Sequence, residues 1–237
     1  MVLLLRKRWL VPCFIIVLLA ATSVSLLRVP DTLGVSAPQV IPARATPVLV
    51  LDAGHGGADG GAVSASGVYE SDINLDIALR LRDAFALLGR DVVMTRSNNA
   101  SLADDPAASL RQQKVSDTQN RVDLINSVDG ACLISIHQNS LPGNTSVHGA
   151  QVFYSDTDGS SELAETMQQA LNKAINIDNG KNKKPISRDV YLMNHVTCPA
   201  VLVECGFLSH SAETEQLQDP DYQVLLAVTI CCSATES

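Results

Sequence analysis

The sequence predicts an α/β domain with a largely parallel sheet. Short aliphatic runs alternate along the chain with longer segments whose apolar residues recur every three or four positions, which is typical of strands alternating with amphipathic helices. Several of these runs show no polar alternation, as expected of strands covered by helices on both faces. Aromatic residues make up 4% of a chain that is 46% hydrophobic, so the core is expected to be aliphatic.

The first predicted strand is also the most informative segment. Val48–Leu51 is a continuous aliphatic run that ends at Asp52 and leads into a glycine-rich turn carrying His55. Glycines permit the tight, open backbone that such a turn requires. Ligand sites in α/β folds lie at the carboxyl ends of strands, so His55 is a candidate functional residue.

The next elements follow in a regular order. A helix is predicted to begin at Glu70 and to stop at Gly89, with one apolar face that includes Ile77 and Phe85. The remaining predicted elements are a strand at 91–95, a loop at 97–109, a helix at 110–128 with Val115, Val122 and Ile125 facing inward, strands at 131–136 and 149–154, a helix at 160–175, strands at 190–193 and 200–205, and a helix at 222–230.

The first 46 residues are predicted to precede this domain. Three basic residues at 6–8 are followed by nineteen uncharged residues, Trp9–Leu27, enough to cross a bilayer of about 30 Å. We expect residues 1–27 to be a signal anchor that leaves the rest of the chain outside the membrane, or a cleaved signal peptide of a secreted protein. Residues 28–46 contain three prolines and are predicted to be a linker, with the folded domain at 47–237.

Charge and cysteine content restrict the partners and the redox chemistry. The net charge is −8, which argues against nucleic acid as a partner. Five of the six cysteines lie in the domain, and no CxxC pair is present. Cys132 and Cys205 lie in apolar runs and are interpreted as small buried hydrophobes.

Two further strand ends carry polar residues where an apolar run stops. His137 follows the run at 131–136, and Glu204 lies within the run at 200–205, where an unpartnered carboxylate would be costly to bury. Two imidazoles, a carboxylate and an open position make a catalytic zinc site. Glu70 is the natural carboxylate ligand beside His55 and His137, and Glu204 would then be free to transfer protons.

Several neighbouring polar residues have more than one interpretation. Asp52 either orients His55 as a hydrogen-bonding partner or caps the turn, and Asn139 either contacts substrate or fixes its loop. Arg96 and Arg121 are expected to tie helices and loops together. The remaining histidines are interpreted as loop or surface residues, namely His148, His195 and His210.

Four motifs in register resemble the zinc-dependent N-acetylmuramoyl-L-alanine amidases. The segments are LDAGHGGADGGA at 51–62, with Glu70 following in YESDINLDIA, MTR at 94–96, SIHQNS at 135–140 and VLVECGFLSH at 201–210. The resemblance covers residues 47 to about 226. It implies one zinc ion per chain held by His55, Glu70 and His137, with Glu204 as catalytic acid/base.

The resemblance also implies a fold and a substrate. The expected fold is a single domain with a mixed, mainly parallel sheet of about six strands flanked by helices, similar to phosphorylase/hydrolase-like folds. The expected reaction is hydrolysis of the amide between the lactyl group of N-acetylmuramic acid and L-alanine of peptidoglycan, by a monomer. The length of the chain and its N-terminal segment most resemble the spore-germination branch of this family. The alternatives are another zinc peptidase of the wall and a non-catalytic, membrane-tethered wall-binding protein.

Overall fold

The computed structural model describes residues 47–186 and 189–235. The predicted anchor and linker, residues 1–46, lie outside the described residues. Within the described part of the chain, no helix has the length and apolar character needed to span a membrane.

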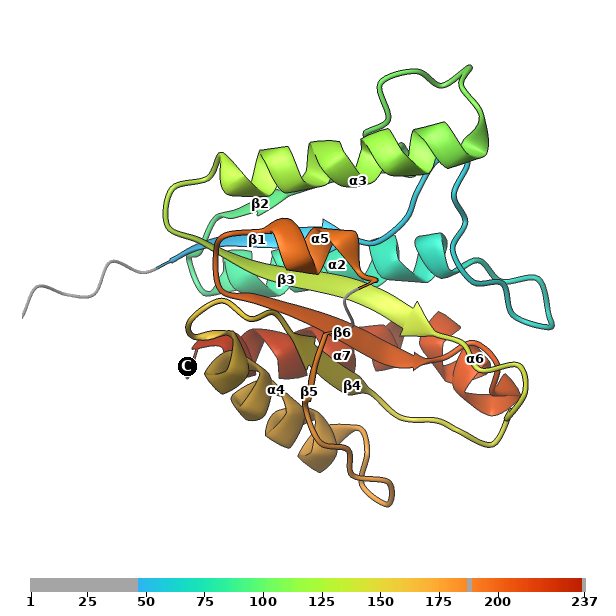
Figure 1. Cartoon of the computed structure of the whole chain (residues 1–237). Coiled ribbons are helices and arrows are strands. Elements are labelled where there is room, and N and C mark those ends of the chain that lie inside the picture. Colours follow the sequence, from blue (N-terminus) through green and yellow to red (C-terminus); the bar gives the residue numbers. More distant parts are fainter. Residues whose placement is uncertain (1–46, 187–188, 236–237) are drawn as a thin grey trace, which may run out of the picture. The chain divides into compact units, whose positions relative to one another are not determined.

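One mixed sheet organises the described domain (Figure 1). Its order is β2-β1-β3-β6-β4-β5, with β2, β1, β3 and β6 parallel and β4 antiparallel to β6. The strands are β1 Val48–Ala53, β2 Val92–Met94, β3 Ala131–Asn139, β4 Gln151–Tyr154, β5 Lys184–Pro185 and β6 Ala200–Phe207. The mixed, mainly parallel six-stranded sheet predicted from the sequence is therefore confirmed.

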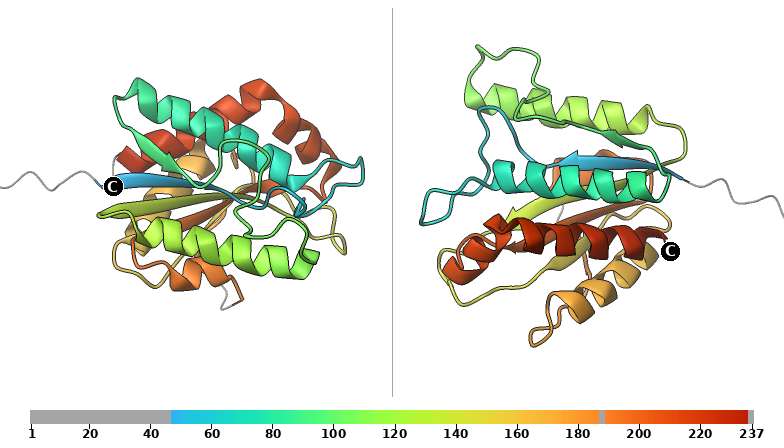
Figure 2. Two further views of the ribbon diagram at one scale, coloured as in Figure 1. Left: turned by 90° about the horizontal axis from the view of Figure 1, so that it is seen from above. Right: turned by 180° about the vertical axis from the view of Figure 1, so that it is seen from behind.

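Helices cover both faces of the sheet, as the view from above in Figure 2 shows. They are α2 Glu70–Leu87, α3 Leu110–Asn126, α4 Ser160–Ala174, α5 Tyr191–His195, α6 Ser211–Gln218 and α7 Pro220–Thr235. The larger apolar core joins α2, α4 and α7 to one face, and a smaller core joins α3 and α5 to the other. The fold is therefore a three-layer α/β/α arrangement.

Local sequence explains where the helices that border the site begin and end. Glu70 and Asp72 lie in the first turn of α2, where acidic groups interact favourably with the helix dipole. The helix ends just before Gly89, whose φ of 69° is the left-handed conformation that glycine adopts readily. Ser109 and Gln112 form a capping box at the start of α3.

Three predictions about the elements were wrong or incomplete. Val115 is 52% exposed rather than buried, although Val122 and Ile125 do pack inward. The predicted strand at 190–193 is the short helix α5, because its apolar residues pack against α3 instead of pairing with a strand. Helix α6 and strand β5 were not predicted; α6 is largely polar and β5 has two residues, so neither has a clear apolar period.

The cysteines follow the prediction. All five cysteines in the described ranges are unpaired, and Cys132 and Cys205 are buried among apolar side chains. Burial raises the pKa of the Cys132 thiol to about 11, which leaves it unreactive at neutral pH.

Candidate functional site

The face of the sheet that contacts α3 and α5 changes from apolar to polar along its central strands. Val50, Leu133 and Leu202 belong to the smaller core. Further along the same strands the side chains of this face are Asp52 on β1, then His137 on β3 and Glu204 on β6. The polar residues predicted at strand ends therefore gather on one face at the carboxyl end of the parallel strands.

His55, Glu70 and His137 come together at this end of the sheet. Glu70 Oε1 lies 3.2 Å from His55 Nε2 and 2.9 Å from His137 Nδ1. One ligand atom from each residue lies within 4.8 Å of the others, an arrangement that can hold a metal ion. A tetrahedral site with ligand bonds of about 2.0–2.2 Å has edges of about 3.3–3.6 Å. The two separations are a few tenths of an ångström shorter, so small side-chain shifts would let the donor set hold a zinc-sized cation.

Glu70 is held in place by more than the two histidines. Its carboxylate accepts hydrogen bonds from the backbone N–H groups of Ala62 and Gln138 and from the side chain of Asn74. Burial alone would raise its pKa, but the bonds to His137 and His55 hold the pKa well below the ordinary range of a glutamate. The group is therefore a fixed anion between two imidazoles.

The glycine-rich turn that carries His55 has a strained backbone, which hydrogen bonds from two arginines hold in place. His55 has a φ of 60°, which is uncommon for a residue with a side chain. Arg121 donates to the carbonyl of His55 at 2.6 Å and to that of Ala53 at 2.8 Å. Arg96 donates to the carbonyls of Ala53 and Gly54 at 2.8 and 2.9 Å. The two arginines tie the turn to its surroundings, as expected from the sequence.

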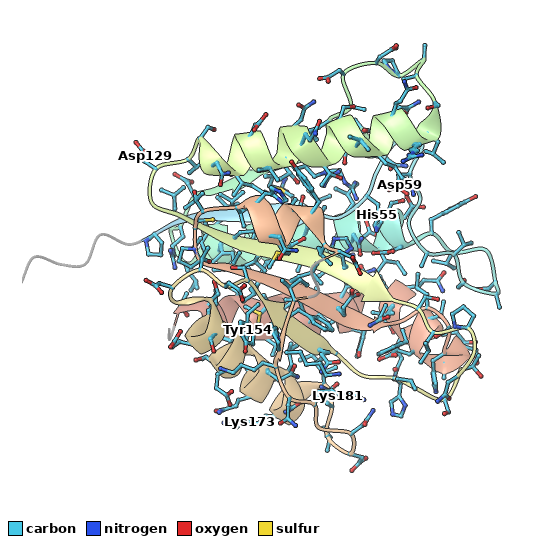
Figure 3. The ribbon with its side chains drawn as sticks, in the orientation of Figure 1. His55, Asp59, Asp129, Tyr154, Lys173 and Lys181 are labelled. Carbon is cyan, nitrogen blue, oxygen red and sulfur yellow. The ribbon has the colours of Figure 1, made fainter. Side chains whose placement is uncertain are left out.

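The carboxylate that orients His55 is Asp59, not Asp52. Asp59 Oδ2 lies 2.8 Å from His55 Nδ1, and Lys114 of α3 lies 2.7 Å from Asp59 Oδ1. Figure 3 shows His55 and Asp59 side by side between the end of β1 and α3. Burial alone would lower the pKa of His55, but its bonds to Asp59 and Glu70 raise it to about 9.

Asp59 was not predicted from the sequence, although its position carries a signal. An acidic residue four positions after His55, inside a glycine-rich turn, lies close enough to reach the ring. Asp52 is instead buried in an ion pair with Arg121 at 2.6 Å and accepts bonds from Thr95 and Ser135 at 2.7 Å. Of the two interpretations of Asp52 left open by the sequence, orientation of His55 was wrong, because the Asp52 carboxylate is bonded to Arg121, Thr95 and Ser135 instead.

Two glycines leave room for the site. A Cβ on Gly54 would overlap the ring of His137, and a Cβ on Gly61 would lie within 2.9 Å of both Glu70 and the His55 ring. Gly61 also has a φ of 68°, a conformation that favours glycine. The turn therefore needs glycine for close approach of the site residues as well as for backbone freedom.

Glu204 lies beside His137 on the neighbouring strand. The two residues are direct partners in the parallel pairing of β3 and β6, so their side chains point to the same face. Glu204 Oε2 is buried and has no hydrogen-bond partner among the described residues. Burial is the main cause that raises its pKa to about 7, with the charge of Glu70 adding to it and the two histidines opposing it.

Asn139 and the other histidines occupy separate positions. The Asn139 side chain accepts from the Ser140 N–H at 2.8 Å, which fixes the loop after β3. Asn139 also lines a cavity of about 490 Å³ beside the site, together with Gln151, Phe207 and residues of the β5 edge. His148 and His195 are exposed, and the His210 side chain accepts from the N–H of Glu213 at the start of α6.

Comparison with known proteins points to one family. A family model described as N-acetylmuramoyl-L-alanine amidase matches residues 49–235. The chain is 38% identical over 184 residues to the germination-specific N-acetylmuramoyl-L-alanine amidase of Bacillus subtilis, covering 77% of this chain and 76% of that protein.

Solved structures agree with the sequence comparison. The CwlD amidase from Clostridioides difficile, solved in complex with the GerS lipoprotein, superposes with a TM-score of 0.76 at 35% identity over 80% of this chain and 97% of that one. The amidase AmiC2 of Nostoc punctiforme gives a TM-score of 0.67 at 28% identity, over 81% of this chain and 96% of that one.

Proposed function

The chain belongs to the N-acetylmuramoyl-L-alanine amidase family, and from this premise we propose that it hydrolyses peptidoglycan with a zinc ion held by His55, Glu70 and His137 and with Glu204 as acid/base. The bond cleaved in this family joins the lactyl group of N-acetylmuramic acid to L-alanine. The observation that carries the proposal is the juxtaposition of a three-residue donor set with the buried Oε2 of Glu204 on the adjacent strand, which has no hydrogen-bond partner among the described residues.

The three proposed ligands contribute different kinds of donor to the cation. Glu70 supplies the negative charge, and the two imidazoles supply nitrogen ligands. Asp59 fixes the orientation of the His55 ring, a role that carboxylates commonly play beside ligating histidines. A bound zinc ion would lower the pKa of a coordinated water from 15.7 to about 7 and polarise the substrate carbonyl.

Glu204 is suited to move protons in this reaction. In the metal-free protein, burial raises its pKa to about 7, close to the operating pH at which a general acid/base is most effective. The unpartnered Oε2 can accept a proton from the attacking water and return it to the amine of the departing L-alanine. Positioned acid/base groups of this kind contribute about 10²–10⁴ in rate.

The cellular setting is part of the proposal. Similarity to a germination-specific amidase supports a role in spore cortex maturation or germination. We further propose that residues 1–27 export the catalytic domain, residues 47–237, and tether it to the membrane facing the wall, with residues 28–46 as the linker. Cleavage of the N-terminal segment would give a secreted enzyme instead.

Product analysis tests the activity against its alternatives. Zinc-loaded protein is incubated with intact wall or cortex, and the products are identified by mass spectrometry. The proposal predicts glycan strands with free lactyl groups and peptides that begin with L-alanine. Release of D-alanine would indicate a wall carboxypeptidase, and binding without cleavage would indicate a non-catalytic wall-binding protein.

A further inference from the structure

The cavity beside Glu204 carries positive charge in a chain of net charge −8. We propose that this groove binds the acidic stem peptide of the substrate and that Lys181 and Lys184 determine specificity for peptide carboxylates, an inference that rests on the proposed function. The groove is defined by Asn139, Gln151, Phe153, Lys181, Lys184 and Phe207, which lie among its lining residues.

The groove is adjacent to the proposed catalytic residues. Gln151 is the direct partner of Glu204 in the pairing of β4 with β6, and Phe207 is the partner of Asn139, two residues after His137. Gln151 also donates to the carbonyl of Asn182 at 2.8 Å, which ties the lysine-bearing loop to the floor of the groove. A substrate cleaved at Glu204 can therefore extend directly over this surface.

The lysines of the β5 edge divide between the two faces of the sheet. Lys184 pairs with Phe153, which belongs to the face that carries Glu204. Lys183 points to the opposite face, where it donates to Ser161 of α4 at 2.7 Å and lies 5.4 Å from the ring centre of Tyr154. Side-chain alternation thus places Lys184 in the groove and removes Lys183 from it.

The charge of the groove and its distance from Glu204 both favour the stem peptide, rather than the glycan, as the part of the substrate that it binds. No residue of the described chain that lines the groove is acidic. The N-acetylated sugars of the glycan are neutral, whereas stem peptides carry free carboxylates, so the complementary ligand is the peptide. Strands β6 and β5 are two spacings apart, about 10 Å, which about three extended residues span at about 3.3–3.6 Å each.

Figure 3 shows Lys181 in the loop between α4 and β5, across β6 from His55. The Lys181 ammonium donates to the side chain of Asn179 at 3.2 Å. That contact directs the Lys181 side chain without neutralising it. The arrangement leaves two cations along the path of a peptide that leaves the site toward β5.

The test compares two substrates that share one glycan and differ in one charge. Their stems are L-alanyl-D-glutamate with free carboxylates and the same stem with the α-carboxylate converted to an amide. For the zinc-loaded full chain we expect kcat/KM to favour the acidic stem about fivefold, the factor expected of two partly exposed ion pairs. In K181Q/K184Q that ratio should fall to near one, through KM rather than kcat.

The control is K183Q, which removes one lysine charge from the other face and should keep the fivefold ratio. Raising the salt concentration should reduce the ratio in the wild type, because exposed ion pairs are screened. An unchanged ratio in K181Q/K184Q, or an equal loss in K183Q, would overturn the inference. Failure of the wild type to cleave either stem would instead refute the proposed function.

Discussion

Gly54 gives the sharpest structural prediction, because its lack of a side chain makes room for a proposed metal ligand. A Cβ at this position would lie closer than 3.0 Å to three atoms of the His137 ring, whereas ordinary contact begins at 3.4 Å. Because the nearest ring atoms would lie far inside that limit, the ring would have to move by about 1 Å. Metal–ligand distances lie within about 0.2 Å of their standard values, so we expect Gly54→Ala to weaken zinc binding at least tenfold.

The backbone itself should accept the substitution. Gly54 does not have the left-handed φ found at Gly56 and Gly57, so alanine adds steric conflict with His137 and no backbone strain. The fold should therefore persist while the affinity for zinc falls. The assay is competition with a chromogenic chelator, combined with thermal unfolding of the metal-free protein.

A matched control is available in Gly143. It also has an ordinary φ, and a Cβ there would meet nothing within 4 Å, so Gly143→Ala should leave zinc affinity and stability unchanged. Wild-type zinc affinity in Gly54→Ala would refute the reasoning, because it would show that the His137 ring is not a ligand held against this glycine.

Three further predictions concern pH and packing. Because His55 has a pKa of about 9 in the metal-free protein and must lose its proton to bind zinc, zinc affinity should rise about tenfold per pH unit between pH 6 and 8, measured by competition with corrections for the chelator; a flat profile would contradict this. Burial alone would raise the pKa of Asp52, but Arg121 and its hydrogen bonds lower it from 3.8 to about 2. The stabilisation from this ionised group is present above pH 4 and lost as the pH falls toward 2, a loss of about 2 kcal/mol. In urea unfolding, the stability difference between wild type and Asp52→Asn should shrink over that range, and a constant difference would count against the buried pair. Phe85→Ala should lower the free energy of unfolding by about 3–5 kcal/mol because the ring is fully buried, whereas Leu87→Ala, at an 89% exposed position of the same helix, should change it by less than about 0.5 kcal/mol; similar losses in both would contradict the assigned packing.

The fold could be predicted from the sequence wherever burial imposes a regular pattern. The aliphatic runs at β1, β3 and β6 lie in the centre of the sheet, and α2 has a long apolar face with a glycine stop. The elements that were predicted wrongly or missed are those with only a few buried residues. Helix α5 covers the sheet with five residues, too few to show a helical period, and α6 is anchored by Glu213, whose carboxylate accepts from the N–H groups of Gly149 and Phe207.

The candidate site was predictable in part for a related reason. His55, His137 and Glu204 interrupt apolar runs, and parallel strands bring such interruptions to one edge of the sheet. The polar residues that hold the site residues in place do not interrupt an apolar run, so the sequence does not single them out. Asp52 and Asp59 are both acidic and both near His55 in the sequence. Asp52 pairs with Arg121 of α3, which leaves Asp59 to orient His55, and the local sequence does not reveal the position of Arg121.

The central claim is that Glu204 transfers protons at a zinc site formed by other residues. Glu204→Gln keeps the size of the side chain and removes its basicity, so the measurement is zinc content together with cleavage of peptidoglycan at the lactyl–alanine bond. We predict one zinc ion per chain, as in the wild type, and a loss of about 10²–10⁴ in kcat. Retained hydrolysis by zinc-loaded Glu204→Gln would contradict it.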